Sequence, residues 1–389
     1  MYKFLFFDPA ITGHHSEYIG HIVNYLSDNE IKDKDFFFIV HPEFSKNFPD
    51  IFEKASRIKN VTWQQITHQE FAKFKKGSRI KRYIAEFRVL HTYAKRFNVD
   101  HVCCLSINTL QYISVFFKTS YTLSGILFLQ FYRLPKNTMR QKITYSKRYY
   151  ASKLSRLNSK LNRIFILNDE KTTAFMNKEF KTTIFKMLPD PIPQLQPQQN
   201  FDIYQHYEID HNRKIFLHIG ALGNRKGTVE VVESVRFLKK ENQDKIAILL
   251  VGKAGSDVEA NAILMALKES KTKSDVPLIW DRRFVPSPVM KSLFDQCKAV
   301  LMPYKNAEFS SGILGHAAAA NKPVIATGSG LIRELVEEFN LGVLLDTTSA
   351  ETIASKIEEL LFFDFNSGGQ DHFLESHHPD IFAKMLIDN

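Results

Sequence analysis

One segment has the residue types and spacing of a diphosphate-binding loop. Residues 218–227 read His-Ile-Gly-Ala-Leu-Gly-Asn-Arg-Lys-Gly, between an apolar run and a helical pattern. Glycine lets the backbone approach a ligand closely, and the first amides of a helix have no partner within it. Arg225 and Lys226 at that positive helix end would neutralise a diphosphate. The glycines at 220, 223 and 227 match neither the dinucleotide fingerprint nor the Walker pattern, and a plain surface turn is the alternative.

A second segment offers small side chains and amides after another apolar run. Residues 302–317 read Met-Pro-Tyr-Lys-Asn-Ala-Glu-Phe-Ser-Ser-Gly-Ile-Leu-Gly-His-Ala. Ser310, Ser311 and Gly312 begin a predicted helix, and this start suits a phosphate. Glu308 lies just before that helix, where it can accept hydrogen bonds from sugar hydroxyls or simply cap the helix.

A third segment lies near the N-terminus. Residues 8–16 read Asp-Pro-Ala-Ile-Thr-Gly-His-His-Ser, between a predicted strand and a predicted helix that starts near Ser16. Gly13 permits close approach of a ligand, and His14 and His15 can contact an acceptor hydroxyl or handle a proton. An ordinary turn between a strand and a helix would also explain the glycine.

The elements that position these loops follow from hydrophobic patterning. Strand-length apolar runs alternate with helix-period segments along most of the chain, which indicates parallel α/β sheets with crossover helices. Ligands in such sheets bind beyond the carboxyl ends of the strands, where all three loops fall. Strands are predicted at residues 3–8, 35–41, 61–66, 101–106, 123–130, 163–168, 182–188, 214–220, 245–252, 277–282, 299–304, 323–327 and 343–346. Helices of the first half are predicted near residues 15–28, 78–97, 139–162 and 169–178.

Two domains are expected from the length of 389 residues and from one proline-rich interruption. Residues 189–197 contain four prolines, which cannot donate to a sheet, so this segment is interpreted as a linker. The predicted boundaries are a first domain at 1–188, a linker at 189–199 and a second domain at 200–361. The tail at 362–389 is expected to pack back on the first domain.

In their order along residues 1–350, these features resemble the retaining, nucleotide-sugar-dependent glycosyltransferases of the GT-B architecture, specifically the large family four, or group 1. Gly13 resembles the glycine loop after the first strand, and residues 186–193 resemble the family's hinge entry. Gly220-x-Leu222-x-x-x-Lys226-Gly227 resembles the donor-diphosphate loop. Glu308 begins a stretch similar to the Glu-x7-Glu motif.

The resemblance implies two Rossmann-like doubly wound domains facing a cleft, and a metal-independent hexosyl transfer from a nucleoside-diphosphate sugar to a glycan or lipid-linked acceptor with retention. It implies no cofactor, and a role in cell-surface polysaccharide or glycolipid synthesis. Its catalytic residues would be Lys226, Arg225 and Glu308, with Gly220, Gly227, Ser310, Ser311, Gly312 and His316 on the donor. The acceptor would contact Gly13, His14, His15 and Ser16.

Two departures keep other functions open. Ala221 stands where the family has an arginine, and His316 stands where the second glutamate of the motif is expected. A glycosyltransferase-like binding or scaffold subunit is therefore one alternative. A nucleotide-sugar 2-epimerase of the same architecture is another.

Charge is unevenly distributed along this chain of net charge +10. No acid occurs between Asp100 and Asp169, whereas cations are frequent there. A solvated basic face is one interpretation; contact with an anionic membrane or a lipid-linked diphosphate is another, and nucleic acid is not expected as a partner. In the predicted helix 139–162 and just after it, one stripe is expected to comprise Arg140, Lys147, Lys153, Arg156, Lys160 and Arg163.

Other features limit the cellular and chemical context. The three cysteines give neither a disulfide framework nor a zinc spacing, and the apolar runs are too short for a signal peptide or a membrane span, so a cytoplasmic protein is expected, peripheral at the membrane at most. Asp33-Lys34-Asp35 fits a metal motif of other glycosyltransferases, but it precedes a strand and so lies at the wrong sheet edge. No metal site is predicted.

Overall fold

A computed structural model describes residues 1–389 except 117, 306–307, 364, 366–367 and 389. The chain forms two compact units, of which unit 1 comprises residues 1–191 and 378–389 and unit 2 comprises residues 192–377. The chain therefore passes from unit 1 to unit 2 within the proline-rich segment expected to be the linker, and it returns to unit 1 near the C-terminus.

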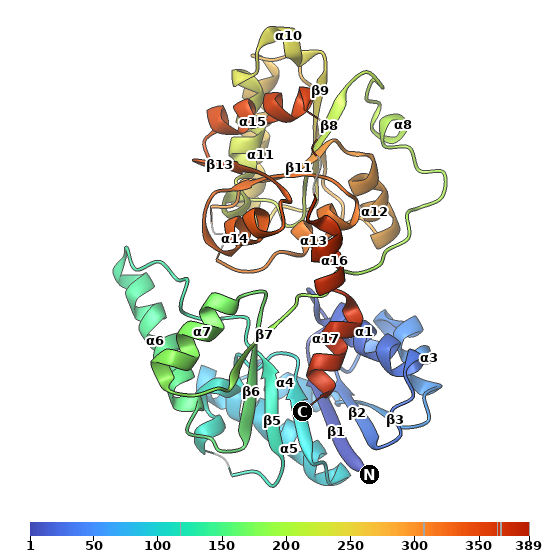
Figure 1. Ribbon diagram of the computed structural model, residues 1–389, viewed down its shortest axis with the longest axis vertical. Helices are drawn as coiled ribbons and strands as arrows, with labels where there is room; N and C mark the ends of the chain where they lie inside the picture. The colour runs from blue at the N-terminus through green and yellow to red at the C-terminus, as the bar shows by residue number, and fades with distance from the viewer. Residues whose placement is uncertain (117, 306–307, 364, 366–367, 389) are drawn as a thin grey trace. The chain divides into compact units, whose positions relative to one another are not determined.

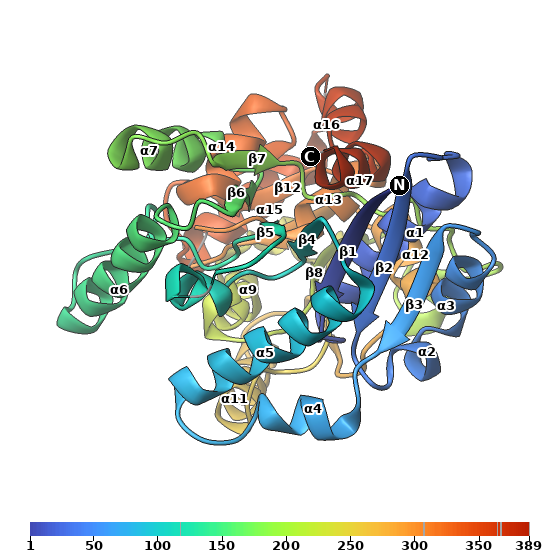
Figure 2. The ribbon, with the colours of Figure 1, turned by 90° about the horizontal axis from the view of Figure 1, so that it is seen from below.

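Unit 1 is built on a parallel sheet of seven strands in the order β3-β2-β1-β4-β5-β6-β7 (Figure 2). β1 runs in register between β2 and β4, with Phe6 opposite Phe38 and Cys103. The strands are β1 (Tyr2–Asp8), β2 (Lys34–Val40), β3 (Val61–Gln65), β4 (His101–Cys104), β5 (Thr122–Ile126), β6 (Leu161–Leu167) and β7 (Phe185–Leu188).

Helices cover both faces of this sheet. Phe4 and Phe6 of β1 pack in one cluster with the first and last helices of the chain, and Leu5 and Phe7 pack in another with the long helix α5. Figure 1 shows α1 and α17 side by side, a contact between the two ends of the chain. The helices are α1 (His15–Asp28), α2 (Phe44–Asn47), α3 (Pro49–Ser56), α4 (His68–Lys73), α5 (Arg79–Phe97), η1 (Leu110–Tyr112), η2 (Ser114–Phe116), α6 (Met139–Ser155), α7 (Glu170–Phe180) and α17 (Pro379–Ile387).

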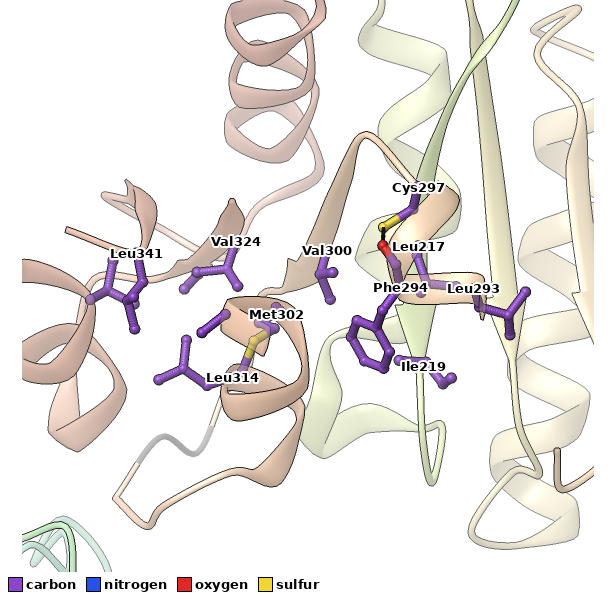
Figure 3. Packing of buried hydrophobic residues seen from close by; sticks show 14 of the residues in the cluster. Leu217, Ile219, Leu293, Phe294, Cys297, Val300, Met302, Leu314, Val324 and Leu341 are labelled. Carbon is purple, nitrogen blue, oxygen red and sulfur yellow. Dashed lines mark hydrogen bonds between the residues drawn. The ribbon is translucent and has the colours of Figure 1, made fainter. Parts of the chain in front are cut away.

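Unit 2 is built on a second parallel sheet, of six strands in the order β10-β9-β8-β11-β12-β13. Figure 3 shows part of its core, where side chains of the central strands such as Leu217 and Val300 meet Phe294 and Leu314 from two helices. The strands are β8 (Lys214–Ile219), β9 (Ile246–Val251), β10 (Leu278–Asp281), β11 (Ala299–Met302), β12 (Val324–Thr327) and β13 (Gly342–Leu345). The helices are α8 (Ile203–Tyr207), η3 (Asn224–Lys226), α9 (Thr228–Ser234), η4 (Val235–Phe237), α10 (Lys240–Gln243), α11 (Asp257–Lys271), α12 (Ser287–Gln296), α13 (Gly312–Ala319), α14 (Gly330–Glu338), α15 (Ala350–Phe362) and α16 (Gln370–Ser376).

Strand order fixes one point in each sheet where a ligand is expected. In unit 1, β2 and β3 extend the sheet on one side of β1, and β4 and the later strands extend it on the other, so the order reverses between β1 and β4. In unit 2, the order reverses in the same way between β8 and β11. The crevice at such a reversal, at the carboxyl ends of the strands, is where doubly wound sheets bind ligands. All three predicted loops leave a strand that flanks one of these points.

The predicted α/β fold class is confirmed, but one predicted helix is wrong in length. α6 ends at Ser155, because the chain turns at Asn158, whose Oδ1 accepts from the amide of Lys160 at 3.0 Å, and then enters β6. Arg156 donates to the carbonyl of Phe180, and Arg163, on β6, donates to that of Asp388. The predicted stripe therefore does not extend beyond α6. In the described part of the chain, no helix has both the length and the apolar character needed to cross a bilayer.

Candidate functional site

In unit 2, the loop after β8 depends on its glycines. Gly220 has φ +119° and Gly227 has φ +68°, values that side chains with a Cβ rarely adopt. A Cβ on Gly220 would lie 2.4 Å from Nζ of Lys226, and one on Gly227 would lie 2.3 Å from the carbonyl oxygen of Pro303. The glycines thus allow the loop to close on its own lysine and on the loop that follows β11.

A buried hydrogen-bond relay fixes this loop to both central strands. The amide of Gly223 donates to Oγ1 of Thr228 at 2.9 Å, and that hydroxyl lies 3.0 Å from Nε2 of His218. Nδ1 of His218 lies 2.8 Å from the carbonyl of Leu301 on β11 and must carry the proton, since a carbonyl only accepts. Burial lowers the pKa of His218 to about 3, so the ring is neutral at physiological pH. His218 therefore has a structural role.

Glu259, which no motif in the sequence marks, also fixes the loop. Its Oε1 accepts from the amide of Asn224 at 3.0 Å, and its carboxylate occupies the space that a Cβ on Gly223 would fill. Glu259 lies in the first turn of α11, whose N-cap is Ser256. Only the capping pattern is visible in the sequence, because the partner loop lies far away along the chain.

Lys226 lies at the carboxyl end of β8 and is 6% exposed. Its Nζ donates to the carbonyl of Ile219 at 2.9 Å and lies 4.9 Å from the ring centroid of Tyr304. A buried ammonium held by one carbonyl and one aromatic face is a fixed positive charge, as a leaving-group clamp requires. Arg225 has an exposed side chain instead, so only Lys226 of these two adjacent cations is buried.

The two predicted phosphate loops of unit 2 are joined to each other. The amide of Lys305 donates to the carbonyl of Arg225 at 3.0 Å. The side-chain Nζ of Lys305 donates to Oδ1 of Asn224 at 2.8 Å and forms an ion pair with Oε1 of Glu230 at 2.5 Å. The hydroxyl of Tyr304 and Oε2 of Glu230 are buried and have no hydrogen-bond partner within the described residues. Buried polar atoms usually have partners, so these two atoms are consistent with a site completed by a ligand or by water.

The third group of predicted donor residues surrounds the start of α13. Glu308, Ser310 and Ser311 are partly buried, and α13 begins at Gly312. Ser311 occupies the N-cap position without a side-chain capping bond, which leaves its hydroxyl available. His316 lies further along α13, is 9% exposed and packs against the ring of Phe294 at 5.5 Å.

In unit 1, the predicted acceptor residues surround the end of β1. Gly13 has φ +75°, and the space where its Cβ would lie is open. Nδ1 of His15 lies 2.8 Å from Oδ2 of the buried Asp8, and Nδ1 of His14 lies 3.3 Å from Oε2 of Glu17. Burial raises the pKa of Asp8, with His15 opposing this shift, and the hydrogen bond to Glu17 raises the pKa of His14. The helix spans His15–Asp28, which agrees with the range predicted near residues 15–28, and Ser16 is buried.

The opposite side of this reversal point carries polar residues that the sequence analysis missed. Asn108, in the loop after β4, accepts from the amides of Phe128 and Leu129 at 3.1 and 3.0 Å. Thr109 donates to Oε1 of Glu86 on α5 at 2.8 Å. Burial raises the pKa of Glu86 to about 7, with the Thr109 hydrogen bond opposing the shift and Asp8 adding to it. A carboxyl group able to exchange a proton near neutral pH therefore lies at this edge.

A buried ion pair organises the far end of the same edge. Nε and Nη2 of Arg133 donate to the two oxygens of Asp169 at 2.6 and 2.8 Å. The same carboxylate accepts from the amide and hydroxyl of Thr172, at 2.9 and 2.6 Å, and so caps α7. Asp169 thus links the loop after β5 to the end of β6.

A hollow of about 940 Å³ lies at the amino edge of the unit 1 sheet rather than at these loops. It is lined in part by Asp35, Asp50 and Lys54. We do not assign it as the active site, because doubly wound sheets bind ligands at the opposite edge. The described residues contain no group of three or more His, Cys, Asp or Glu side chains placed to hold a metal ion.

Comparison with known proteins gives a family match for most of unit 2 and similar folds for the whole chain. The family described as glycosyl transferases group 1 matches residues 200–362. A search of curated protein sequences gave no match. The structure is similar to WaaG, a glycosyltransferase involved in lipopolysaccharide biosynthesis, with a TM-score of 0.66, 14% identity and 100% of both chains covered. It is also similar to HepE from Anabaena, solved with UDP and glucose, with a TM-score of 0.65, 14% identity and coverage of 100% of this chain and 97% of that one.

A third similar structure is the α,α-trehalose 6-phosphate synthase from Burkholderia multivorans, with a TM-score of 0.70 and 9% identity over 100% of this chain and 97% of that one. At such low identities these likenesses establish the fold. The family match covers the segment that holds both joined loops. Residues 200–362 therefore form a glycosyl transferases group 1 domain, within a chain that has the two-unit GT-B fold of glycosyltransferases.

Proposed function

We propose that this protein transfers a sugar from a nucleoside-diphosphate sugar to an acceptor hydroxyl, with retention of configuration at the anomeric carbon. Its biological role would be in cell-surface polysaccharide or glycolipid synthesis. The observation that carries the proposal is the joining of the Gly220–Gly227 loop to the loop after β11, at the reversal point of the unit 2 sheet. The similar HepE was solved with UDP and glucose, which supports a nucleotide-sugar donor. The similar WaaG is involved in lipopolysaccharide biosynthesis, which supports the biological role.

The chemistry follows from where charge develops. As the bond between sugar and diphosphate breaks, the sugar becomes cation-like and negative charge grows on the departing diphosphate. Lys226, Arg225 and the amides near Ser311 and Gly312 would stabilise that charge more in the transition state than in the ground state. Glu308 would hold sugar hydroxyls, with Gly220, Gly227, Ser310 and His316 completing the donor site. Gly13, His14, His15 and Ser16 would orient the acceptor hydroxyl.

The test is incubation of the purified chain with UDP-, GDP- and ADP-sugars, with nucleotide release and sugar products both measured. Nucleotide release that depends on an acceptor, with a glycoside of retained configuration as product, would establish the proposal. A free epimerised sugar would indicate a 2-epimerase. Donor binding without turnover would indicate a scaffold subunit, an alternative favoured by the exposed Ala221 in place of an arginine and by the packing of His316 against Phe294.

We expect turnover to persist in excess EDTA. The proposed site neutralises the leaving diphosphate with Lys226, Arg225 and helix amides, so no divalent cation is required for that role. The rate should stay within about twofold of the untreated enzyme, a difference of less than 0.5 kcal/mol in the barrier. Loss of turnover in EDTA that Mg²⁺ or Mn²⁺ restores would contradict this part of the proposal.

Peripheral contact with an anionic membrane is also part of the proposal, and α6 is the element that supports it. Figure 2 shows α6 projecting from the β5–β6 side of the unit 1 sheet. Its exposed apolar row comprises Met139, Ile143, Tyr150 and Leu154, each at least 45% exposed. At 3.6 residues per turn these four fall within roughly 60° of one another, with Arg140 and Lys147 on one side and Lys142 and Lys153 on the other. An apolar row flanked by cations is typical of a helix lying in a membrane interface.

We expect the protein to co-sediment with vesicles that contain anionic lipid at low salt. Each cation at the interface contributes about 1 kcal/mol to binding. Because salt screens this attraction, binding should weaken as the salt concentration rises. Met139→Gln with Leu154→Gln should weaken binding at least tenfold without changing net charge. The matched control is Val258→Gln, which removes an exposed apolar side chain from α11 of unit 2. If the wild type does not bind anionic vesicles at low salt, α6 is only a solvated surface.

A further inference from the structure

A hollow of about 690 Å³ lies in unit 1 between α5, η1, the loop after β5 and α6. This volume is within the range of small-molecule sites. Four cations line it, namely Arg79 at the start of α5 and Arg140, Lys147 and Arg148 on α6. None of the described residues that line it is acidic. We call it the basic pocket.

Three of the four cations of the basic pocket have no acidic partner among the described residues. Within the described part of the chain, Arg79, Arg140 and Lys147 form no ion pair with an acid, although exposed cations elsewhere do so, such as Arg333 with Glu337 at 2.9 Å. Nη1 of Arg148 donates to the carbonyl of Gln130 at 3.0 Å, which fixes its guanidinium at the wall. Such a concentration of positive charge in a hollow favours an anionic ligand.

The wall of the pocket is aromatic and close to the predicted acceptor edge. The rings of Tyr83 and Tyr112 stack with centroids 5.7 Å apart. Burial and Tyr83 raise the pKa of Tyr112, whereas the charges of Arg148 and Arg79 lower it. Asn108 and Thr109 also line the pocket and belong to the loop after β4, at the reversal point of the unit 1 sheet. The pocket therefore adjoins the place where an acceptor is expected.

We propose that the basic pocket binds the phosphate or diphosphate group of a phosphorylated acceptor. This inference rests on the proposed glycosyl transfer, because it assigns the acceptor's anionic group to a subsite of unit 1. Arginine guanidinium groups and a lysine ammonium pair well with phosphate oxygens, and the tyrosine hydroxyls can donate to them.

The pocket also has an apolar side that suits a lipid-linked phosphate. Ile143 and Leu129 line it and are 47% and 44% exposed. Ile143 also belongs to the apolar row of α6, so a ligand with its phosphate in the pocket could lay an alkyl chain along that row. A soluble sugar phosphate would use the cations alone.

The test is binding to the full chain without any donor sugar, with inorganic pyrophosphate and with a polyprenyl diphosphate in neutral detergent micelles as separate probes. Arg140→Gln with Lys147→Gln should weaken binding of both probes at least tenfold. Lys268→Gln with Lys271→Gln is the matched control, since it removes the same charge from the last turn of α11, outside the pocket, and it should change binding less than twofold. If the wild type binds the polyprenyl diphosphate more tightly than pyrophosphate, and Ile143→Gln abolishes this difference, the acceptor is a lipid-linked phosphate. If both probes bind with equal affinity, the acceptor is a soluble phosphate.

Equal losses in the two charge variants, or no binding of either probe by the wild type, would overturn the pocket assignment. Because no donor is present, binding does not depend on turnover. A chain that binds pyrophosphate through the pocket but transfers no sugar would contradict the proposed function and retain the pocket. A chain that transfers sugar equally well without Arg140 and Lys147 would retain the function and contradict the pocket.

Discussion

Replacement of Lys226 by methionine should lower kcat by 10²-fold or more. Methionine fills most of the same space and removes only the ammonium that lies at the end of β8, 2.9 Å from the carbonyl of Ile219. A fixed donor aimed at developing negative charge is worth about 2.7 to 4 kcal/mol in the transition state. The loss should appear mainly in kcat, because the charge of the leaving diphosphate grows as the bond breaks. Steady-state kinetics with the donor identified by the nucleotide-sugar panel would measure it.

Lys305→Met is the matched control, because Lys305 belongs to the same pair of loops but directs its ammonium at Asn224 and Glu230. Its effect on kcat should stay below tenfold. Unfolding of unit 2 can be followed through Trp280 in a Trp63→Phe background, since each unit contains one of the two tryptophans. A Lys226→Met protein that is folded and has wild-type kcat would exclude the leaving-group role.

The positions of the strands along the chain could be predicted because each central strand is buried on both faces. Runs such as Phe4–Phe7 and Ile246–Val251 are continuously apolar, and the residues of each run alternate between two packed clusters, one on each face of its sheet. The loops that carry Lys226 and Ser311 were found for a related reason. Glycines and small polar residues directly after such runs mark the carboxyl edge of a parallel sheet, whatever the rest of the chain does.

Contacts between distant segments could not be predicted in the same way. Glu259, Glu86 and Asn108 are ordinary polar residues in the sequence, and each acquires its role from a partner at least twenty residues away. The end of α6 was missed because the residues after Ser155 retain helical charge spacing, while the turn depends on Asn158 and on pairing of β6 with β5. Tertiary contacts decide such points.

The second large effect is expected on stability, at the Arg133–Asp169 pair of unit 1. Asp169→Ala should lower the free energy of unfolding of this unit by about 3 to 5 kcal/mol, because it leaves the guanidinium of Arg133 buried without its counter-charge. The side chains of Arg133 and Asp169 are only 8% and 2% exposed, so water cannot replace the lost partner. The substitution also removes the cap of α7, which adds to the cost.

The measurement is urea unfolding followed through Trp63 in a Trp280→Phe background, so that only unit 1 is reported. The double substitution Arg133→Met with Asp169→Ala separates the two contributions. If the uncompensated charge dominates, the double variant should recover more than half of the lost stability; if the lost cap and hydroxyl contacts dominate, it should recover almost none. A single Asp169→Ala variant whose free energy of unfolding lies within about 0.5 kcal/mol of the wild type would show that the pair does not stabilise unit 1, since changes of that size are typical of surface positions.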